Sequence, residues 1–328
     1  MSKTKRNIDG ETLGVIFRKH NLGEIKGVTP LKGGMFNSVL KVTVTSGKSY
    51  AIKIAPPDDV SVLTYEKNLI KSEAYFYEKF ASLKNVKVPK IYGCDWDENS
   101  DYRYLIMEFI DGELLNKVRL SKNEESQLMF ELGCAMAEIH SLPCEDGFGY
   151  LQNGLYDSWD KAYLTMAENV IKNAESKKAK IPYLDEIRKI FCENEELLSS
   201  VNRPCYNHFD LWAGNIMVKE NKLYALIDCE RAMLGDRMGD FISLDYLAAF
   251  DKEKKKDLIA GYNSVAKEPL TFNTEEMKRL YLMKLYLGLI VYTEQHYRYS
   301  KFSPVFYGGK VFGKKVIANA IKNLRKLG

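Results

Sequence analysis

Residues 208–215 read His-Phe-Asp-Leu-Trp-Ala-Gly-Asn, and residues 226–230 read Leu-Ile-Asp-Cys-Glu. An aspartate, an asparagine five positions later and a second aspartate after a hydrophobic run are residue types that phosphoryl transfer uses. Asp210 can accept a proton from an attacking hydroxyl, and the oxygens of Asn215 and Asp228 suit magnesium, a hard cation. The pattern therefore predicts Asp210 as the catalytic base and Asn215 and Asp228 as metal ligands.

The spacing matches the catalytic-loop pattern H-R-D-x-x-x-x-N of protein kinases, with Phe209 in place of the arginine. We expect His208 to brace this loop by hydrogen bonding. His140 ends a predicted helix, where interaction with the helix dipole or with a loop carboxylate is expected. Glu230 could reach a second metal through water, but a surface or salt-bridged acid is the simpler interpretation.

Lys53 is the predicted phosphate contact upstream. It lies in the alternating segment 50–54, where Ala51 points to the same face of the sheet. An adenine ring can then lie on Ala51 while Lys53 reaches the phosphates. Because a buried or cleft lysine needs a carboxylate partner, we expect Glu73 of the following helix to pair with it, with Glu66 as the alternative.

Further nucleotide contacts are predicted on both sides of Lys53. Gly33 and Gly34 precede a strand, and glycines let backbone N–H groups approach phosphates. Ser38 can add a polar contact. Because a full G-x-G-x-x-G is absent, a plain hairpin turn is the alternative. The backbone groups of Glu108 and Ile110 are placed by position alone to pair with an adenine edge.

The pattern of elements changes near residue 110. Before it, strands are predicted over 38–45, 50–54, 88–92 and 102–109, with one long helix over 61–82. After it, the prediction is mainly helical, with short strands at 216–218 and 223–227 and helices over 124–141, 158–175, 183–200, 238–249, 251–264, 274–298 and 313–326. We therefore expect an α+β fold of two lobes, a small β-rich lobe (1–110) and a large helical lobe (111–328), with a nucleotide cleft between them.

Taken together, these motifs resemble the aminoglycoside phosphotransferase family, the small-molecule branch of the protein-kinase-like fold. The residues that carry the resemblance are Gly33-Gly34, Lys53, Glu73, Ile139-His140-Ser141-Leu142, His208-x-Asp210 with Asn215, Ile227-Asp228-x-Glu230, Gly235-Asp236 and Gly239-Asp240-Phe241. It extends over roughly residues 25–250. It implies Mg²⁺, ATP or GTP as donor, and transfer of the γ-phosphoryl group to a hydroxyl.

Residue by residue, the resemblance implies Asp210 as base, Asn215 and Asp228 as metal ligands, Lys53 as phosphate contact and Asp240 as a structural acid of the helical lobe. The chain has no A-P-E segment and no long activation segment after Asp228. Both absences argue against a protein kinase and in favour of a small-molecule acceptor.

The acceptor pocket is expected in the helical lobe, from about residue 150 to 180 and from 265 to 310. Asp157, Asp160 and Glu294 are the candidate contacts. An aminoglycoside-like amino sugar is the expected acceptor, although residues 230–300 balance eleven acidic against eleven basic residues. The alternatives are a choline, homoserine, sugar or ketosamine kinase, and a nucleotide-binding protein without catalysis.

The bulk composition is that of an ordinary globular protein of 328 residues with 45% hydrophobic residues. A formal net charge of +4 does not favour nucleic acid or a membrane as the main partner. The six cysteines show no CxxC pair, and MSKTKRNIDG has no apolar leader-like run. We expect a cytoplasmic protein, monomeric or weakly dimeric.

Overall fold

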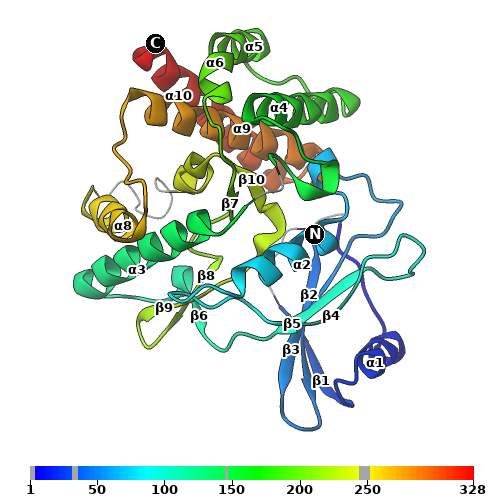
Figure 1. Ribbon diagram of the computed structural model, residues 1–328. Coiled ribbons are helices and arrows are strands. Elements are labelled where there is room, and N and C mark those ends of the chain that lie inside the picture. Colours follow the sequence, from blue (N-terminus) through cyan, green and yellow to red (C-terminus); the bar gives the residue numbers. More distant parts are fainter. Residues whose placement is uncertain (1–3, 32–35, 145–146, 244–251) are drawn as a thin grey trace.

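The computed structural model of the protein describes residues 4–31, 36–144, 147–243 and 252–328. An antiparallel sheet dominates the N-terminal region, and helices dominate the C-terminal region (Figure 1). The predicted α+β arrangement is confirmed in this division.

Five antiparallel strands form the N-terminal sheet in the order β1-β2-β3-β5-β4. They are β1 (Ile25–Pro30), β2 (Ser38–Val44), β3 (Ser49–Ile54), β4 (Ile91–Asp95) and β5 (Tyr104–Glu108). Strand β1 was not predicted. Strand β4 begins after the predicted start at Val88, because Pro89 has no N–H to give to a ladder.

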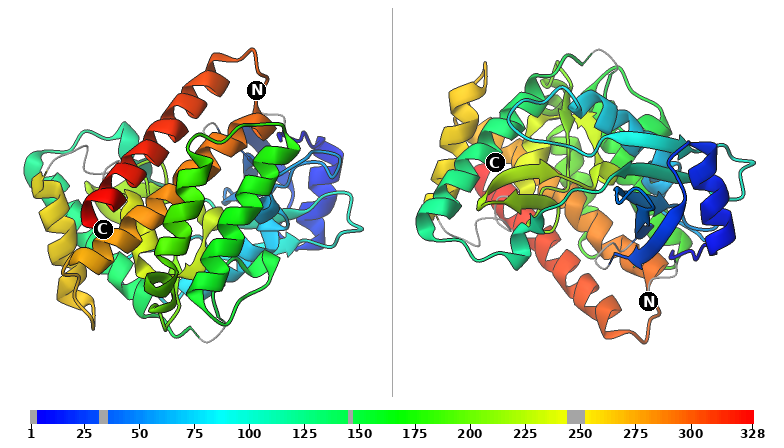
Figure 2. Two further views of the ribbon diagram at one scale, coloured as in Figure 1. Left: turned by 90° about the horizontal axis from the view of Figure 1, so that it is seen from above. Right: turned by 90° about the horizontal axis from the view of Figure 1, so that it is seen from below.

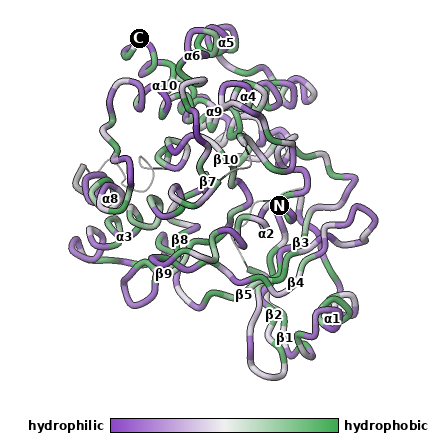
Figure 3. The backbone as a smooth tube through the Cα atoms, viewed as in Figure 1, coloured by the Kyte–Doolittle hydropathy of each residue, from purple (hydrophilic) through white to green (hydrophobic). Residues whose placement is uncertain are grey.

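The two faces of the sheet are covered by different helices. Helix α1 (Gly10–Lys19), which the sequence pattern did not predict, packs its Phe17 with Tyr50 and Ile52 of β3. Ala51 and Lys53 face the other side, toward α2 (Leu69–Phe80). This alternation along β3 is what the sequence pattern predicted. Strand β5 carries buried residues to both faces, and the tube near its label is largely green, hydrophobic, in Figure 3.

The helix predicted over 61–82 is shorter than expected. A single 3₁₀ turn, η1 (Thr64–Glu66), precedes α2, and Asn68 between them adopts a left-handed conformation with φ 54°. A local cap closes the turn, because Glu66 accepts a hydrogen bond from the Leu63 N–H at 2.9 Å. Two tertiary contacts then hold it: Gln152 donates to the Tyr65 carbonyl at 2.6 Å, and Arg298 lies 2.6 Å from Glu66. The turn is therefore anchored on the C-terminal region.

The long α9 (Thr274–Arg298) lies in the C-terminal region, and its predicted bounds are confirmed. The other α-helices described there are α3 (Lys122–Ser141), α4 (Trp159–Ser176), α5 (Leu184–Glu193), α6 (Glu195–Ser199), α8 (Lys252–Val265) and α10 (Pro304–Leu327). Helices α4, α6 and α10 pack on α9, while α3 and α8 pack on each other. Helix α9 lies between α4 and α10 in the left view of Figure 2. None of the described helices combines the length and the apolarity that crossing a membrane needs.

Three of the helices predicted after residue 110 also differ from the structure. The segment 183–200 is divided at Asn194, whose side chain donates to the Ile190 carbonyl at 2.8 Å. Helix α10 begins at Pro304 instead of residue 313, because Ser303 caps it and proline suits a first helical position. In place of the helix predicted from 238, residues 237–243 form a 3₁₀ helix, η5, and the remainder lies outside the described residues.

Two small sheets flank the motif residues 208–215 and 227–230. Strand β7 (Cys205–Asn207) pairs with β10 (Met233–Gly235), and β8 (Ile216–Lys219) pairs with β6 (Glu113–Leu114) and β9 (Lys222–Leu226). The loop 208–215 therefore joins the two sheets, and residues 227–232 return from the second sheet to the first. This crossing places the two halves of the motif side by side.

Candidate active site

One buried carboxylate, that of Asp240, binds the backbone at the start of the loop 208–215. Asp240, 1% exposed, accepts the N–H groups of His208 at 3.1 Å and of Phe209 at 2.6 Å. Its carboxylate also lies 3.0 Å from Nε2 of His140. The structural role implied for Asp240 and the carboxylate contact expected of His140 are both present.

The two halves of the motif are joined by His208. Its Nε2 lies 3.1 Å from the carbonyl oxygen of Ile227. A carbonyl can only accept, so Nε2 carries the hydrogen. The expected bracing role of His208 corresponds to this bond.

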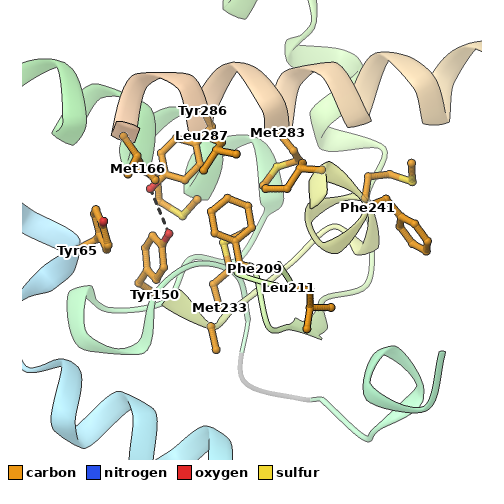
Figure 4. Close-up of a cluster of buried hydrophobic side chains, with 14 of the residues drawn as sticks. Tyr65, Tyr150, Met166, Phe209, Leu211, Met233, Phe241, Met283, Tyr286 and Leu287 are labelled. Atoms are coloured by element: carbon orange, nitrogen blue, oxygen red, sulfur yellow. Dashed lines mark hydrogen bonds between the residues drawn. The ribbon is translucent and has the colours of Figure 1, made fainter. Parts of the chain in front are cut away.

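Phe209, in the position of the kinase arginine, anchors the loop in the hydrophobic core. Its backbone is left-handed, with φ 59°, a conformation that costs a residue with a side chain about 1–3 kcal/mol. Its ring is 1% exposed and lies 5.9 Å from that of Tyr286. Figure 4 shows the ring pointing toward Met283 and Tyr286 of α9. Core packing thus holds a strained turn that turns the next residue, Asp210, outward.

Asp210 is partly accessible to solvent, with its side chain 24% exposed. Asn215 donates to its Oδ2 and to its main-chain oxygen, each at 2.9 Å. Nη1 of Arg231 lies 3.9 Å from Oδ1. Burial raises the pKa of the Asp210 carboxyl, Arg231 opposes that rise, and the neighbouring Asp228 adds to it.

Lys53, Glu73 and Asp228 form a second group of charges, here called the cleft cluster. Nζ of Lys53 lies 2.5 Å from Oε1 of Glu73 and 2.5 Å from Oδ1 of Asp228. Burial disfavours the charge of Asp228, but Lys53 overcomes it and holds the pKa of this carboxyl below its usual range. Of the two partners considered for Lys53, the structure supplies Glu73, while Glu66 lies against Arg298 at 2.6 Å.

Backbone geometry also presents Asp228 to the cleft. It follows β9 in a left-handed conformation, with φ 67°, and its N–H donates to Oη of Tyr77 in α2 at 2.8 Å. The tyrosine hydroxyl satisfies a donor that the strained turn removes from the ladder. Tyr77 was not singled out from the sequence, and only its place one turn after Glu73 could have indicated it.

The donor set around Asn215 and Asp228 fits magnesium. The Ile227 N–H donates to the Asn215 carbonyl at 3.0 Å across the β8–β9 hairpin. Asp228, the next residue after Ile227, therefore lies near Asn215. Both offer oxygen ligands, and Mg²⁺ binds through one or two such protein groups together with phosphates and water. Among the described residues no group of three or more His, Cys, Asp or Glu is arranged to hold a metal by itself.

Glu230 is a partly buried acid with Asp228 and Lys53 as charged neighbours. It accepts a hydrogen bond from Nδ2 of Asn37 at 3.0 Å, just before β2. Burial, with Asp228 as a like-charged neighbour, raises the pKa of the Glu230 carboxyl to about 8. The expected surface acid is thus a hydrogen-bonded link between the two regions.

The other predicted nucleotide residues have mixed surroundings. Gly33 and Gly34 lie outside the described residues. Oγ of Ser38 accepts the Arg6 N–H at 2.9 Å. The N–H of Glu108 donates to the Lys90 carbonyl at 2.7 Å, so this donor is used within the protein. Ile110, 7% exposed, packs with hydrophobic neighbours at the start of the C-terminal region.

The three acceptor candidates are not gathered in one place. Asp157 is exposed before α4, and Asp160 lies in the first turn of that helix. Glu294, 3% exposed, lies 2.9 Å from Nη2 of Arg231 and 3.1 Å from Nη2 of Arg298. Glu294 therefore reaches the site only through Arg231, a residue that the sequence did not single out. The sequence feature that could have indicated Arg231 is its position three residues after Asp228.

The fold is that of a class, the phosphotransferases with a kinase-like fold. A model of the phosphotransferase enzyme family matches residues 27–278, which is most of the chain. The chain belongs to this family, and the resemblance found in its sequence is confirmed. The expected bilobal, kinase-like fold is confirmed as well by similar solved structures.

Three of those structures are informative. A putative aminoglycoside phosphotransferase from Ralstonia eutropha JMP134 has a TM-score of 0.70 at 16% identity, covering 98% of this chain and 99% of its own. A putative fructosamine-3-kinase from Thermobifida fusca YX-ER1 has a TM-score of 0.68 at 20% identity, covering 95% and 100%. The streptomycin–ATP ternary complex of APH(2'')-IIa has a TM-score of 0.60 at 19% identity, covering 96% and 99%. Such identities show the fold.

One curated relative is similar over a shorter stretch. The chain is 27% identical over 120 residues to altered inheritance of mitochondria protein 9, mitochondrial, of Meyerozyma guilliermondii. The match covers 36% of this chain and 19% of that protein. The chain thus spans about a fifth of the relative's length.

Proposed function

We propose that the protein transfers the γ-phosphoryl group of ATP or GTP, with Mg²⁺, to a hydroxyl of an amine-bearing sugar. The observation that carries this proposal is the pairing of an accessible Asp210 with the adjacent cleft cluster. A base for the acceptor and charges for the phosphates then lie on the two ends of one short segment, 208–228. Phosphoryl transfer requires mainly this positioning and charge stabilisation.

On the donor side, residues 1–110 bind the nucleotide. Lys53, fixed by Glu73, contacts the phosphates, and Ala51 forms one wall of the adenine site. The carbonyl of Glu108 and the backbone of Ile110 contact the adenine edge, since the Glu108 N–H is used by Lys90. Magnesium held by Asn215 and Asp228 neutralises charge on the phosphate oxygens when bound.

On the acceptor side, residues 111–328 supply the base. Asp210 accepts a hydrogen bond from the acceptor hydroxyl, orients its oxygen and takes its proton as the phosphoryl group arrives. Asn215 holds Oδ2 of the carboxylate, so the attacking oxygen approaches a fixed group. Asp157 and Asp160 remain the candidate contacts for the amines of the acceptor.

The acceptor class rests on what the similar structures have in common. Their names include aminoglycoside phosphotransferases, one with streptomycin and ATP bound, and fructosamine-3-kinases. Aminoglycosides and fructosamines differ in size, yet both are hydroxyl-rich sugars that carry an amine. We therefore place the aminoglycoside-like amino sugar and the ketosamine together ahead of choline, homoserine and simple sugars.

An acceptor screen tests the proposal. Purified protein with Mg·ATP or Mg·GTP is offered aminoglycosides, ketosamines, choline, homoserine and sugars, and release of ADP or GDP is measured. Turnover with an amine-bearing sugar, lost in Asp210→Ala, supports the proposal. Turnover restricted to choline, homoserine or amine-free sugars overturns the acceptor class. Nucleotide binding without turnover on any acceptor overturns the catalytic function.

A further inference from the structure

A chain of four buried charges runs behind Asp210. Its members are Arg231 after the motif, Glu294 and Arg298 on α9, and Glu66 on η1, and we call it the α9 charge chain. The successive contacts are 2.9 Å from Arg231 to Glu294, 3.1 Å from Glu294 to Arg298 and 2.6 Å from Arg298 to Glu66. Each side chain is at most 9% exposed.

The α9 charge chain ends beside Asp210, the proposed base. Nη2 of Arg231 is bound to Oε2 of Glu294, while Nη1 of the same guanidinium lies 3.9 Å from Oδ1 of Asp210. A guanidinium is planar, with its donors in a fixed fork. Once Glu294 holds one nitrogen, the direction of the other is therefore set.

The distance of 3.9 Å is longer than a hydrogen bond. If Glu294 were neutral, Arg231 would have Asp210 as its nearest carboxylate and could close on both of its oxygens, because arginine and carboxylate favour a bidentate pair. Such a pair would occupy the oxygen that must accept the hydroxyl of the acceptor. Glu294 thus holds Arg231 near Asp210 but out of direct contact with it.

Arg298 and Glu66 secure Glu294 from the other side. Glu66 is itself held by the Leu63 N–H, and its neighbour Tyr65 stacks on Tyr150 at 5.4 Å between ring centres. Figure 4 shows Tyr65 and Tyr150 beside the cluster that contains Phe209. The Glu66 end of the α9 charge chain is therefore also held by contacts of its own.

We infer that Glu294 and Arg298 are positioning residues for the proposed reaction, which keep Arg231 from closing on Asp210 and so leave the base open to the acceptor hydroxyl. This inference rests on the proposed function of Asp210. It changes the role expected of Glu294 from acceptor contact to support of the base.

The test compares Glu294→Gln with Glu276→Gln. Glu276 is a matched control, because it lies on the same helix, is 4% exposed and pairs with Arg237 at 2.7 Å. We expect Glu294→Gln to lower kcat at least about tenfold while the KM and Kd for nucleotide stay within about twofold. We expect Glu276→Gln to keep kcat within about twofold, with a comparable change in Tm.

A double mutant separates positioning from folding. If Glu294 acts through Arg231, Glu294→Gln should add no further loss of kcat to Arg231→Gln, whereas independent structural damage would add. Glu294→Asp keeps the charge but shortens the side chain by one methylene, so it should lower kcat less than Glu294→Gln does. It replaces Glu294→Gln in the test if that variant does not fold.

The outcomes are distinguishable. Wild-type kcat in the folded Glu294 variants, or additive losses in the double mutant, overturns the inference. Full turnover in Asp210→Ala would instead overturn the proposed function itself. Loss in Asp210→Ala with none in Glu294→Gln leaves the function standing and rejects only the role of Glu294.

Discussion

The cleft cluster and the α9 charge chain are both buried ionic groups beside the same catalytic loop, yet their charge balance differs. The cleft cluster sets two carboxylates, Glu73 and Asp228, against the single ammonium of Lys53, and the Asp228 side chain is 27% exposed. The α9 charge chain alternates two carboxylates with two guanidinium groups and is closed to solvent.

The difference teaches what each group can do. An excess of negative charge that is partly open to solvent favours a further cation, and under the proposed function a magnesium–nucleotide complex would supply it. In the α9 charge chain the charges are balanced and buried, so they do not favour binding of a further ion. Their mutual contacts instead fix the positions of the four side chains. Removing one member from a buried chain should therefore cost stability, whereas removing the excess carboxylate of the cleft cluster should cost binding.

The largest expected effect is at Asp210, which lies between the two groups. Asp210→Ala should lower turnover about 10²–10⁴-fold, the range typical of a general base, with nucleotide affinity almost unchanged. Steady-state kinetics with the acceptor found by the screen, together with calorimetric titration of nucleotide, check this. An equal loss of nucleotide binding would contradict the assignment of Asp210 as base.

Glu66→Ala tests the closed chain. It leaves Arg298 with one carboxylate fewer in a buried site, and removing one partner of a buried pair costs about 3–5 kcal/mol of unfolding free energy. Denaturant unfolding measures this. The control is Glu186→Ala, which breaks the pair of Glu186 with Arg325 on the surface and should leave the unfolding free energy almost unchanged. Similar costs for the two variants would show that burial does not distinguish them.

Asp228→Asn tests the open cluster. Loss of a charged contact, worth about 1.5–3 kcal/mol, should weaken Mg·nucleotide binding about 10- to 100-fold. The stability of the nucleotide-free protein should change little, because Lys53 keeps Glu73 as its partner at 2.5 Å. Titration calorimetry and thermal unfolding give the two values. Strong destabilisation with unchanged binding would place Asp228 with the structural charges instead.

The smallest effect concerns His296, a titratable group in neither cluster. Burial, with Lys310 and Lys301 nearby, lowers its pKa from 6.5 to about 4. Between these values the unfolded chain binds more protons than the folded protein, so wild-type stability falls as pH falls from 6.5 toward 4. His296→Phe should make unfolding free energy less dependent on pH in this window. Parallel pH dependence in both proteins would exclude the contribution.

The proximity of the motif residues was predictable because it depends on their spacing along short local elements. Asp210, Asn215 and Asp228 are neighbours through two short hairpin-forming segments, and Lys53 meets Glu73 because an alternating strand precedes a helix of regular period. Such local periodicities can be counted along a chain. The same holds for α9, whose predicted bounds are confirmed.

The break before α2 was not predictable in the same way. Residues 61–82 have helical periodicity. However, η1 is bound by residues of the C-terminal region, such as Gln152 and Arg298, and is separated from α2. These partners lie roughly 90 and 230 positions away in sequence. No local pattern carries that information, since propensity is overridden by tertiary contacts.

The sequence by itself determined the class of chemistry, the lysine–glutamate pair and the two-part organisation, because these follow from residue type, spacing and period. Only the tertiary structure decided the role of each remaining charge. Glu294 had the chemistry of an acceptor contact, but its burial between Arg231 and Arg298 makes it part of a closed chain. A carboxylate's role depends on which charges surround it, and chain folding alone brings those charges together.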